Sequence, residues 1–76
     1  MTMRVRVSLY SALCIDRFAE AEVELTEGAT ISDLLEKLDL PFQDIGIVMV
    51  NAHSGTFQQR LQPGDRITLI PPIGGG

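Results

Sequence analysis

The chain has 76 residues, which is enough for one small domain, because a chain of this length buries only about 60% of the surface that it exposes when unfolded. Ten acidic residues against six basic ones give a formal charge of −4. This balance disfavours nucleic acid as a partner, since phosphates are bound largely by Lys and Arg. A thin core also leaves little room for a deep active site. We therefore expect any chemistry on the surface or tail, with a partner supplying the pocket.

The remaining composition indicates a cytoplasmic protein. The single cysteine, Cys14, excludes an internal disulfide and is typical of a reducing compartment. No segment approaches the ~18 apolar residues of a membrane span, and no signal-peptide pattern precedes the first expected strand. We interpret Cys14 as a packed thiol rather than a nucleophile, and His53 as a solvated loop residue. No motif predicts a bound metal or cofactor, so we expect no catalysis by the chain alone.

The first third of the chain predicts two paired strands. Apolar and polar residues alternate from Met3 to Leu9, which is typical of a strand with one buried face. A second alternation around residues 22–25 predicts another strand. If the two strands pair, the arginines of the first lie on the same outer face as Glu22 and Glu24 of the second. Pairs of opposite charge would then help to fix the register.

One amphipathic helix follows. Thr30 and Asp33 fit a capping box, so we expect the helix to begin directly after Thr30. Apolar residues recur with helical spacing along one stripe, at Ile31, Leu34, Leu35 and Leu38. On the flank we expect an ion pair between Asp33 and Lys37. Pro41 is expected to end the helix.

The second half of the chain predicts three further strands. Residues 45–50 form an apolar run with β-branched residues, which predicts a strand with little solvent on either face. Residues 51–55 predict a polar turn, and a short strand is expected at Thr56–Phe57. The sequence Pro63-Gly64-Asp65 predicts a tight turn. The alternation from Arg66 to Ile70 predicts the last strand.

This order of elements predicts an α+β fold. One amphipathic helix can cover one face of a small mixed sheet. The first and last strands can pair as parallel neighbours in the centre of that sheet. We therefore predict a β-grasp domain over residues 1–70, followed by a flexible C-terminal tail over residues 71–76.

The tail has an unusual composition, Pro71-Pro72-Ile73-Gly74-Gly75-Gly76. Two prolines cannot donate ladder hydrogen bonds and favour an extended chain, so the sheet is expected to stop before them. Fully extended, six residues reach about 20 Å, enough to enter a cleft in another protein. Three glycines carry no Cβ, so protein walls can approach their backbone closely. A glycine-rich end is also typical of frayed termini and linkers.

A bare glycine terminus suits one kind of chemistry. A carboxylate is a poor electrophile until ATP converts it into an acyl-adenylate, after which sulfur can displace AMP and leave a thiocarboxylate. In this hypothesis Gly76 supplies the reacting carboxylate. The residues expected to contact a partner are Ile70, Pro71, Pro72, Ile73, Gly74 and Gly75.

Four blocks of the sequence carry a family resemblance. They are Leu9-Tyr10-Ser11-Ala12-Leu13, residues 25–30, Val50-Asn51, and Pro63-Gly64-Asp65 together with residues 69–76. Together they resemble the ubiquitin-like sulfur-carrier family that includes the small subunit of molybdopterin synthase and the thiamine-pathway sulfur carrier. The long segment before the second strand and the Pro71-Pro72 pair look closer to the molybdopterin branch.

The resemblance implies a mechanism and its partners. It implies a ubiquitin-like fold, adenylation of Gly76 by an ATP-dependent activating enzyme, and thiocarboxylation of that glycine. The sulfur would pass to a large synthase subunit that builds molybdopterin, or to another acceptor enzyme. ATP would be used by the activating enzyme and not bound by this chain. The alternatives are sulfur transfer to thiazole or another pathway, a protein modifier that forms isopeptide bonds, and a non-covalent ubiquitin-like module.

Overall fold

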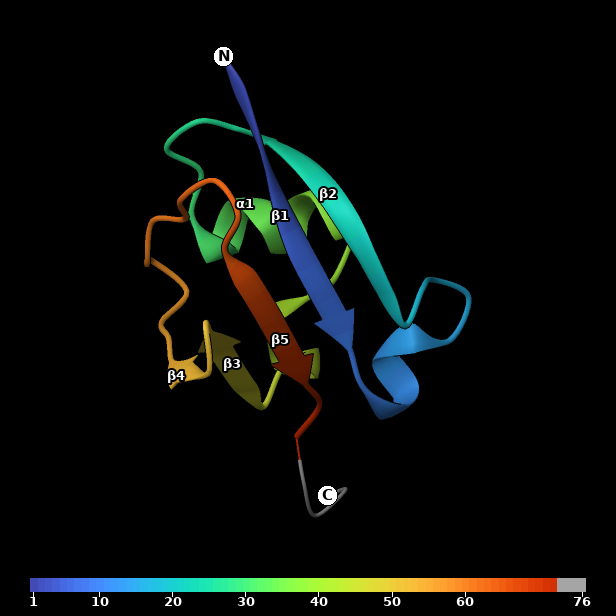
Figure 1. Ribbon diagram of the computed structural model, residues 1–76. Coiled ribbons are helices and arrows are strands. Elements are labelled where there is room, and N and C mark those ends of the chain that lie inside the picture. The colour runs from blue at the N-terminus through green and yellow to red at the C-terminus, as the bar shows by residue number, and fades with distance from the viewer. Residues whose placement is uncertain (73–76) are drawn as a thin grey trace.

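The computed structural model describes residues 1–72 of the chain (Figure 1). Within these residues five strands form one mixed sheet in the order β2-β1-β5-β3-β4. The strands are β1 (Thr2–Leu9), β2 (Glu20–Thr26), β3 (Ile47–Val50), β4 (His53–Ser54) and β5 (Arg66–Ile70). β1 pairs with β2 in antiparallel and with β5 in parallel orientation, so the first and last strands meet in the centre of the sheet. This is the β-grasp topology that the sequence predicted.

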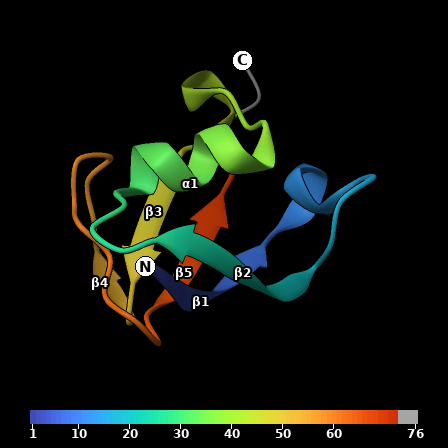
Figure 2. The same ribbon diagram turned by 90° about the horizontal axis from the view of Figure 1, so that it is seen from above.

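The helix α1 (Ile31–Leu38) lies across one face of the sheet (Figure 2). Its predicted capping box is present. The Thr30 hydroxyl accepts a hydrogen bond from the Asp33 N–H at 3.3 Å, and the Asp33 carboxylate accepts one from the Thr30 N–H at 2.9 Å. Asp39 ends the helix in the left-handed conformation, with φ at 59°, before Pro41 is reached.

The predicted Asp33–Lys37 ion pair is absent from the described part of the chain. The Asp33 carboxylate is already engaged in the capping box, where it satisfies a free backbone donor. The Lys37 ammonium instead donates to the carbonyl oxygen of Glu24 in β2. The capping box therefore engages Asp33, and a carbonyl oxygen of β2 engages Lys37, in place of the ion pair expected from helical spacing.

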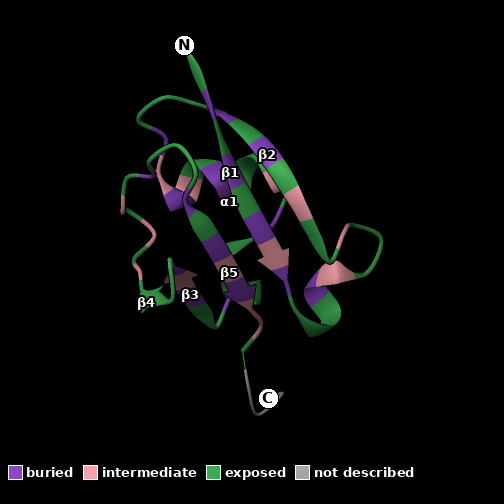
Figure 3. Cartoon of the chain, in the orientation of Figure 1, coloured by how far each residue is buried: buried purple, intermediate pink, exposed green. Residues whose placement is uncertain are grey.

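The core lies between α1 and the inner face of the sheet (Figure 3). The largest fully buried side chains are Ile31, Leu34, Leu35, Leu61, Ile67, Leu69, Val5 and Val7. Three residues of the predicted helical stripe are among them, and the fourth, Leu38, is partly buried against the same cluster. Within residues 1–72 no helix covers the opposite face of the sheet, which we call the open face (Figure 2).

One side of the open face, over β1 and β2, is charged. In the register of β1 and β2, Arg4 lies opposite Glu24, as predicted. Arg6 lies opposite Glu22 in the same way. The guanidinium groups, however, reach diagonally along the strand: Arg4 pairs with Glu22 at 4.0 Å. Arg6 pairs with Glu20 at 3.0 Å. These exposed pairs set the polarity of this side more than they stabilise the fold.

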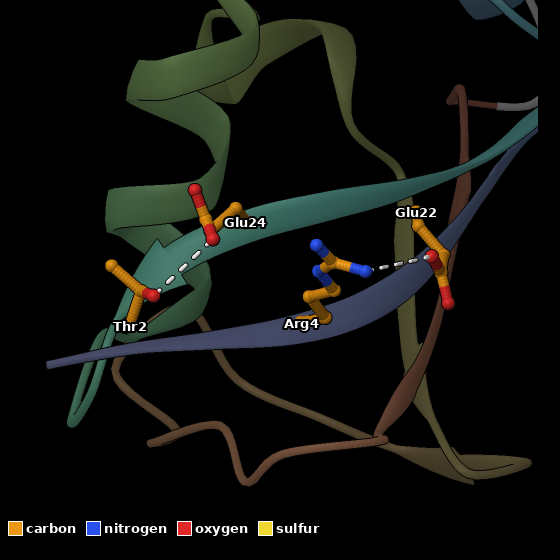
Figure 4. A network of polar contacts seen from close by, with 4 residues as sticks. All are labelled: Thr2, Arg4, Glu22 and Glu24. Atoms are coloured by element: carbon orange, nitrogen blue, oxygen red, sulfur yellow. Dashed lines mark hydrogen bonds and ion pairs between the residues drawn. The ribbon is translucent and has the colours of Figure 1, made fainter.

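The charged network also includes the Thr2 hydroxyl, and it raises the pKa of Arg6. The Thr2 hydroxyl donates to the Glu24 carboxylate at 3.2 Å, beside the Arg4–Glu22 pair (Figure 4). The hydrogen bond with Glu20, and then its negative charge, raise the pKa of Arg6. Because this folded-state pKa lies above the unfolded one, the contribution of the pair to stability is complete below the unfolded value. It is lost only as the pH rises through the folded value, far above neutrality.

The expectation of a strand that is buried on both faces was wrong. The strand β3 begins only at Ile47, and its residues alternate in burial. Val48 and Val50 are buried, whereas Ile47 is 40% exposed. The reason is that α1 covers one face of β3 and leaves the other open, although both faces carry apolar residues.

The position of the short strand was also predicted wrongly. It is β4 at His53–Ser54, inside the segment expected to be a polar turn, and not Thr56–Phe57. The turn itself takes only Asn51 and Ala52, which both have positive φ, at 53° and 69°. Positive φ at both central positions is the pattern of a two-residue hairpin, which brings β4 back directly against β3.

Replacing Ala52 by glycine is expected to stabilise the protein. Alanine is strained at φ 69°, and glycine adopts this conformation freely, so we predict a gain of roughly 0.5–1 kcal/mol in the free energy of unfolding. Urea denaturation measures it. The matched control is Ala21→Gly in the interior of β2, which should lose a similar amount. A less stable Ala52→Gly variant would contradict the assigned turn.

Candidate functional site

The last strand delivers the tail from the middle of the sheet. β5 lies between β1 and β3, and its C-terminal end points away from the domain toward residue 72 (Figure 1). Two backbone hydrogen bonds hold this end. The Tyr10 N–H donates to the Leu69 carbonyl oxygen at 3.2 Å, and the Gly46 N–H donates to the Ile70 carbonyl oxygen at 2.7 Å. Beyond Ile70 the two prolines have no N–H, so the sheet stops where the sequence predicted.

The other end of β5 is held by a buried carboxylate. Asp65 is only 9% exposed. Its oxygens accept from the side-chain amide of Asn51 at 2.9 Å and from the Gln62 N–H at 2.8 Å. The side-chain carbonyl oxygen of Asn51 in turn accepts a hydrogen bond from the Arg66 backbone N–H at 2.9 Å. This network fixes the start of β5 against the β3–β4 turn, so β5 is held at both ends.

The open face becomes apolar near the tail. Its exposed or half-buried residues here are Tyr10, Ile47, Met49, Thr68 and Ile70, which we call the tail-end patch. Ile70 lies opposite Ile47, and Thr68 lies opposite Met49. Tyr10 is 54% exposed and Ile47 is 40% exposed. Since the Arg–Glu network covers the β1–β2 side of the same face, the face changes from charged over β1 and β2 to apolar over β5 and β3, beside the tail.

An open groove runs beside the base of the tail. It lies between two 3₁₀ turns, η1 (Ser11–Cys14) and η2 (Phe42–Asp44). The groove has a volume of about 370 Å³ and is lined by Ala12, Leu13, Arg17, Gln43, Asp44, Pro71 and Pro72. The Arg17 guanidinium donates to the carbonyl oxygens of Leu13 and Asp39, at 3.3 and 3.4 Å. Pro71 and Pro72 therefore form one wall of a surface groove rather than part of a closed pocket.

A comparison with protein-family profiles shows which family this chain belongs to. The profile of the ThiS family matches residues 10–76, which include the η1 segment, β5 and the whole tail. The chain belongs to the ThiS family. No curated protein sequence matches the chain closely enough to count.

Solved structures agree with the fold of this ThiS-family chain. The solution structure of the HVO 2177 protein of Haloferax volcanii has a TM-score of 0.81 at 19% identity, over 99% of this chain and 88% of that one. A protein of Pyrococcus furiosus assigned as molybdopterin converting factor, subunit 1, gives 0.76 at 23% identity, over 93% and 99%. The crystal structure of small archaeal modifier protein 1 of H. volcanii gives 0.80 at 20% identity, over 93% and 99%. At these identities the likeness establishes the ubiquitin-like β-grasp fold.

The structure locates only part of the predicted partner-contacting set. Ile70 is half-buried in the tail-end patch, Pro71 is half-buried, and Pro72 is exposed. Four predicted residues, Ile73, Gly74, Gly75 and Gly76, lie outside the described residues.

The two side chains interpreted as non-catalytic are not members of the tail-end patch. The Cys14 thiol donates to the Ser11 carbonyl oxygen at 3.0 Å, and Cys14 packs against the core. His53 is exposed in β4 rather than in a loop. Among residues 1–72 no group of three or more His, Cys, Asp or Glu side chains is arranged to hold a metal ion.

Sequence reasoning missed most of the tail-end patch. Tyr10 continues the outward alternation of β1, and this signal could have identified it. Ile47 and Met49 stand in a run that is apolar on both faces, so no alternation marks which side is open. Gly46 gave no signal at all, because its importance depends on what lies against it in space. In the described part of the ThiS-family chain, no helix has the length and apolar character needed to cross a membrane.

Proposed function

We propose that this protein is a sulfur carrier whose Gly76 carboxylate is activated and converted to a thiocarboxylate. The observation that carries the proposal is the ThiS-family match, which extends through the glycines to residue 76. The fold supports it, since β5 is fixed at both ends and leads directly into the tail. The proposed chemistry requires a free carboxylate on Gly76 in the working protein.

The proposed chemistry has two steps. The Gly76 carboxylate attacks the α-phosphate of ATP, which gives an acyl-adenylate and pyrophosphate. Hydrosulfide from a sulfur donor then adds to the acyl carbon, a carbon–sulfur bond forms, and AMP leaves with the electrons of the broken carbon–oxygen bond. The product is a thiocarboxylate at Gly76, and neither step needs an oxidant or a reductant.

The chain and its partners divide this work. Residues 1–72 offer open grooves rather than a closed pocket for ATP, so an ATP-dependent activating enzyme supplies the nucleotide site and the catalytic groups. The chain supplies the acyl group and a surface to which the activating enzyme binds. The tail-end patch is that surface, since its exposed apolar residues lie beside the strand that delivers the tail. The reaction consumes ATP, and the proposal locates it in the cytoplasm.

Molybdopterin synthesis is the proposed destination of the sulfur. Three features support it: the Pro71-Pro72 pair, the long segment between β1 and β2, and the fold shared with a molybdopterin converting factor subunit. The acceptor is then a large synthase subunit, for which this chain is the sulfur-donating small subunit. Transfer to thiazole or to another acceptor uses the same tail, and it is the alternative within the carrier role.

Protein modification is a second candidate function. It is favoured by the fold shared with small archaeal modifier proteins. The same acyl-adenylate would then be attacked by a lysine amine instead of by sulfur. Lys37 is the single lysine of this chain, so conjugation between copies through a lysine can occur at one side chain only.

Mass spectrometry separates these functions. With ATP, hydrosulfide and the activating enzyme of the same organism, the intact chain should gain about 16 Da, the difference between sulfur and oxygen. A chain that lacks Gly75 and Gly76 should stay unmodified at an unchanged melting temperature, because its carboxylate reaches about 7 Å less far. Sulfur uptake by the shortened chain would contradict the mechanism, and a lysine adduct would favour the modifier.

Docking is tested at the tail-end patch. Ile47→Glu is expected to weaken binding to the activating enzyme at least about tenfold, because the interface would have to bury a carboxylate in place of the exposed part of an isoleucine. Calorimetry measures the affinity. The matched control, Ile15→Glu, alters an isoleucine that is 63% exposed but lies outside the patch, and it should bind like the wild type. Equal loss in both variants, or in neither, would rule out the patch as the docking surface.

A further inference from the structure

The base of the tail crosses a residue that has no side chain. Gly46 immediately precedes β3, and its N–H donates to the Ile70 carbonyl oxygen at 2.7 Å. The chain then continues past Gly46 itself. A Cβ placed on Gly46 would lie 2.6 Å from the Pro72 Cα, 2.8 Å from the Pro72 nitrogen and 2.9 Å from the Pro71 carbonyl carbon. All three atoms belong to the backbone, so no side-chain rotation can relieve the contact.

Glycine is required at position 46 because a side chain would not fit there, and not because of the backbone angles. Gly46 is not among the glycines with positive φ, so alanine can adopt its backbone angles without strain. Gly46 is also exposed, and a methyl group there does not enter the core. An ordinary contact between carbon atoms is about 3.5–4.0 Å. A side chain at Gly46 would therefore push the backbone at Pro72 away by roughly 1 Å.

We infer that Gly46 is a positioning residue for the tail. Its bare backbone lets Pro71 and Pro72 pass directly over the start of β3, and this passage fixes the position of the backbone at Pro72. The consequence for the reaction rests on the proposed function, since it concerns where the Gly76 carboxylate meets its activating enzyme. A displacement of about 1 Å can slow an enzymatic step by as much as roughly 100-fold when the reacting group loses its alignment.

The inference predicts a separation of binding from chemistry. Gly46→Ala changes no side chain of the tail-end patch, so docking and KM should stay close to the wild-type values. The acyl group would be misplaced, so kcat for adenylation should fall by about 10- to 100-fold. A role in stability alone would instead lower the melting temperature and leave the kcat of the folded fraction unchanged.

The test combines NMR with kinetics. In the wild type, a nuclear Overhauser effect should join the α-protons of Gly46 and Pro72, and its absence would overturn the inference. Pyrophosphate release should show the loss in kcat for Gly46→Ala, with chemical-shift changes centred on Pro71 and Pro72. The matched control is Gly55→Ala, where an added Cβ meets the Gln59 side-chain oxygen at 2.8 Å and the Val50 side chain at 3.1 Å, and not the backbone of Pro71 or Pro72. It should keep the wild-type kcat.

A second variant keeps the test decisive if Gly46→Ala fails to fold. Adding Pro72→Gly to it frees the backbone from the φ that proline imposes, so the chain can pass around the new methyl group. The double variant should then regain folding and part of the lost kcat; no recovery would count against steric positioning. If the wild type itself is never adenylated, the proposed function fails, and the NMR contact and the shifts at Pro72 alone decide the role of Gly46.

Discussion

The structure depends on one strand being held in the centre of the sheet. β5 pairs in parallel with β1, which comes from the other end of the chain, and in antiparallel with β3. Asp65 fixes its start, and the N–H groups of Tyr10 and Gly46 fix its end. Because the contacts of β5 join residues far apart in sequence, they form only when the whole domain folds. The base of the tail is therefore as firmly placed as the fold itself.

The open face carries an apolar patch beside the tail. Over β1 and β2, Arg4 and Arg6 pair with glutamates, and over β5 and β3, Ile47 and Ile70 lie side by side. An apolar patch beside the tail favours contact with a partner, and the charged side favours solvent. Charge on such a surface acts mostly on the rate and specificity of association, whereas apolar burial contributes more to affinity. The apolar part of the face, where a partner gains most affinity, thus lies beside the tail.

Much of the fold could be predicted because its signals are local. The capping box at Thr30, the helical stripe and the alternation of β1 each need only neighbouring residues, and all three are present in the structure. The errors concern matters that the local sequence does not determine. Burial of Ile47 depends on which face α1 covers, and the partner of Lys37 depends on the approach of β2.

The candidate site shows the same division. The prolines and glycines mark the tail in the sequence itself, and Ile70, expected to contact a partner, is half-buried and not part of the core. Ile47 and Met49 join the patch only through strand pairing. Gly46 is separated from Pro72 by twenty-five residues in sequence, yet it lies against it in the fold. Sequence spacing alone cannot express such a contact.

The central claim is that the carboxylate of Gly76 is the group that ATP activates. Chemical ligation can provide two forms of the chain, one ending in the free acid and one in the primary carboxamide. They differ in one terminal group and share the fold, the tail-end patch and all side chains. In the presence of the activating enzyme, the free acid should support exchange of labelled pyrophosphate into ATP, and the carboxamide should not. Equal exchange with both forms, or none with the free acid, would contradict this account.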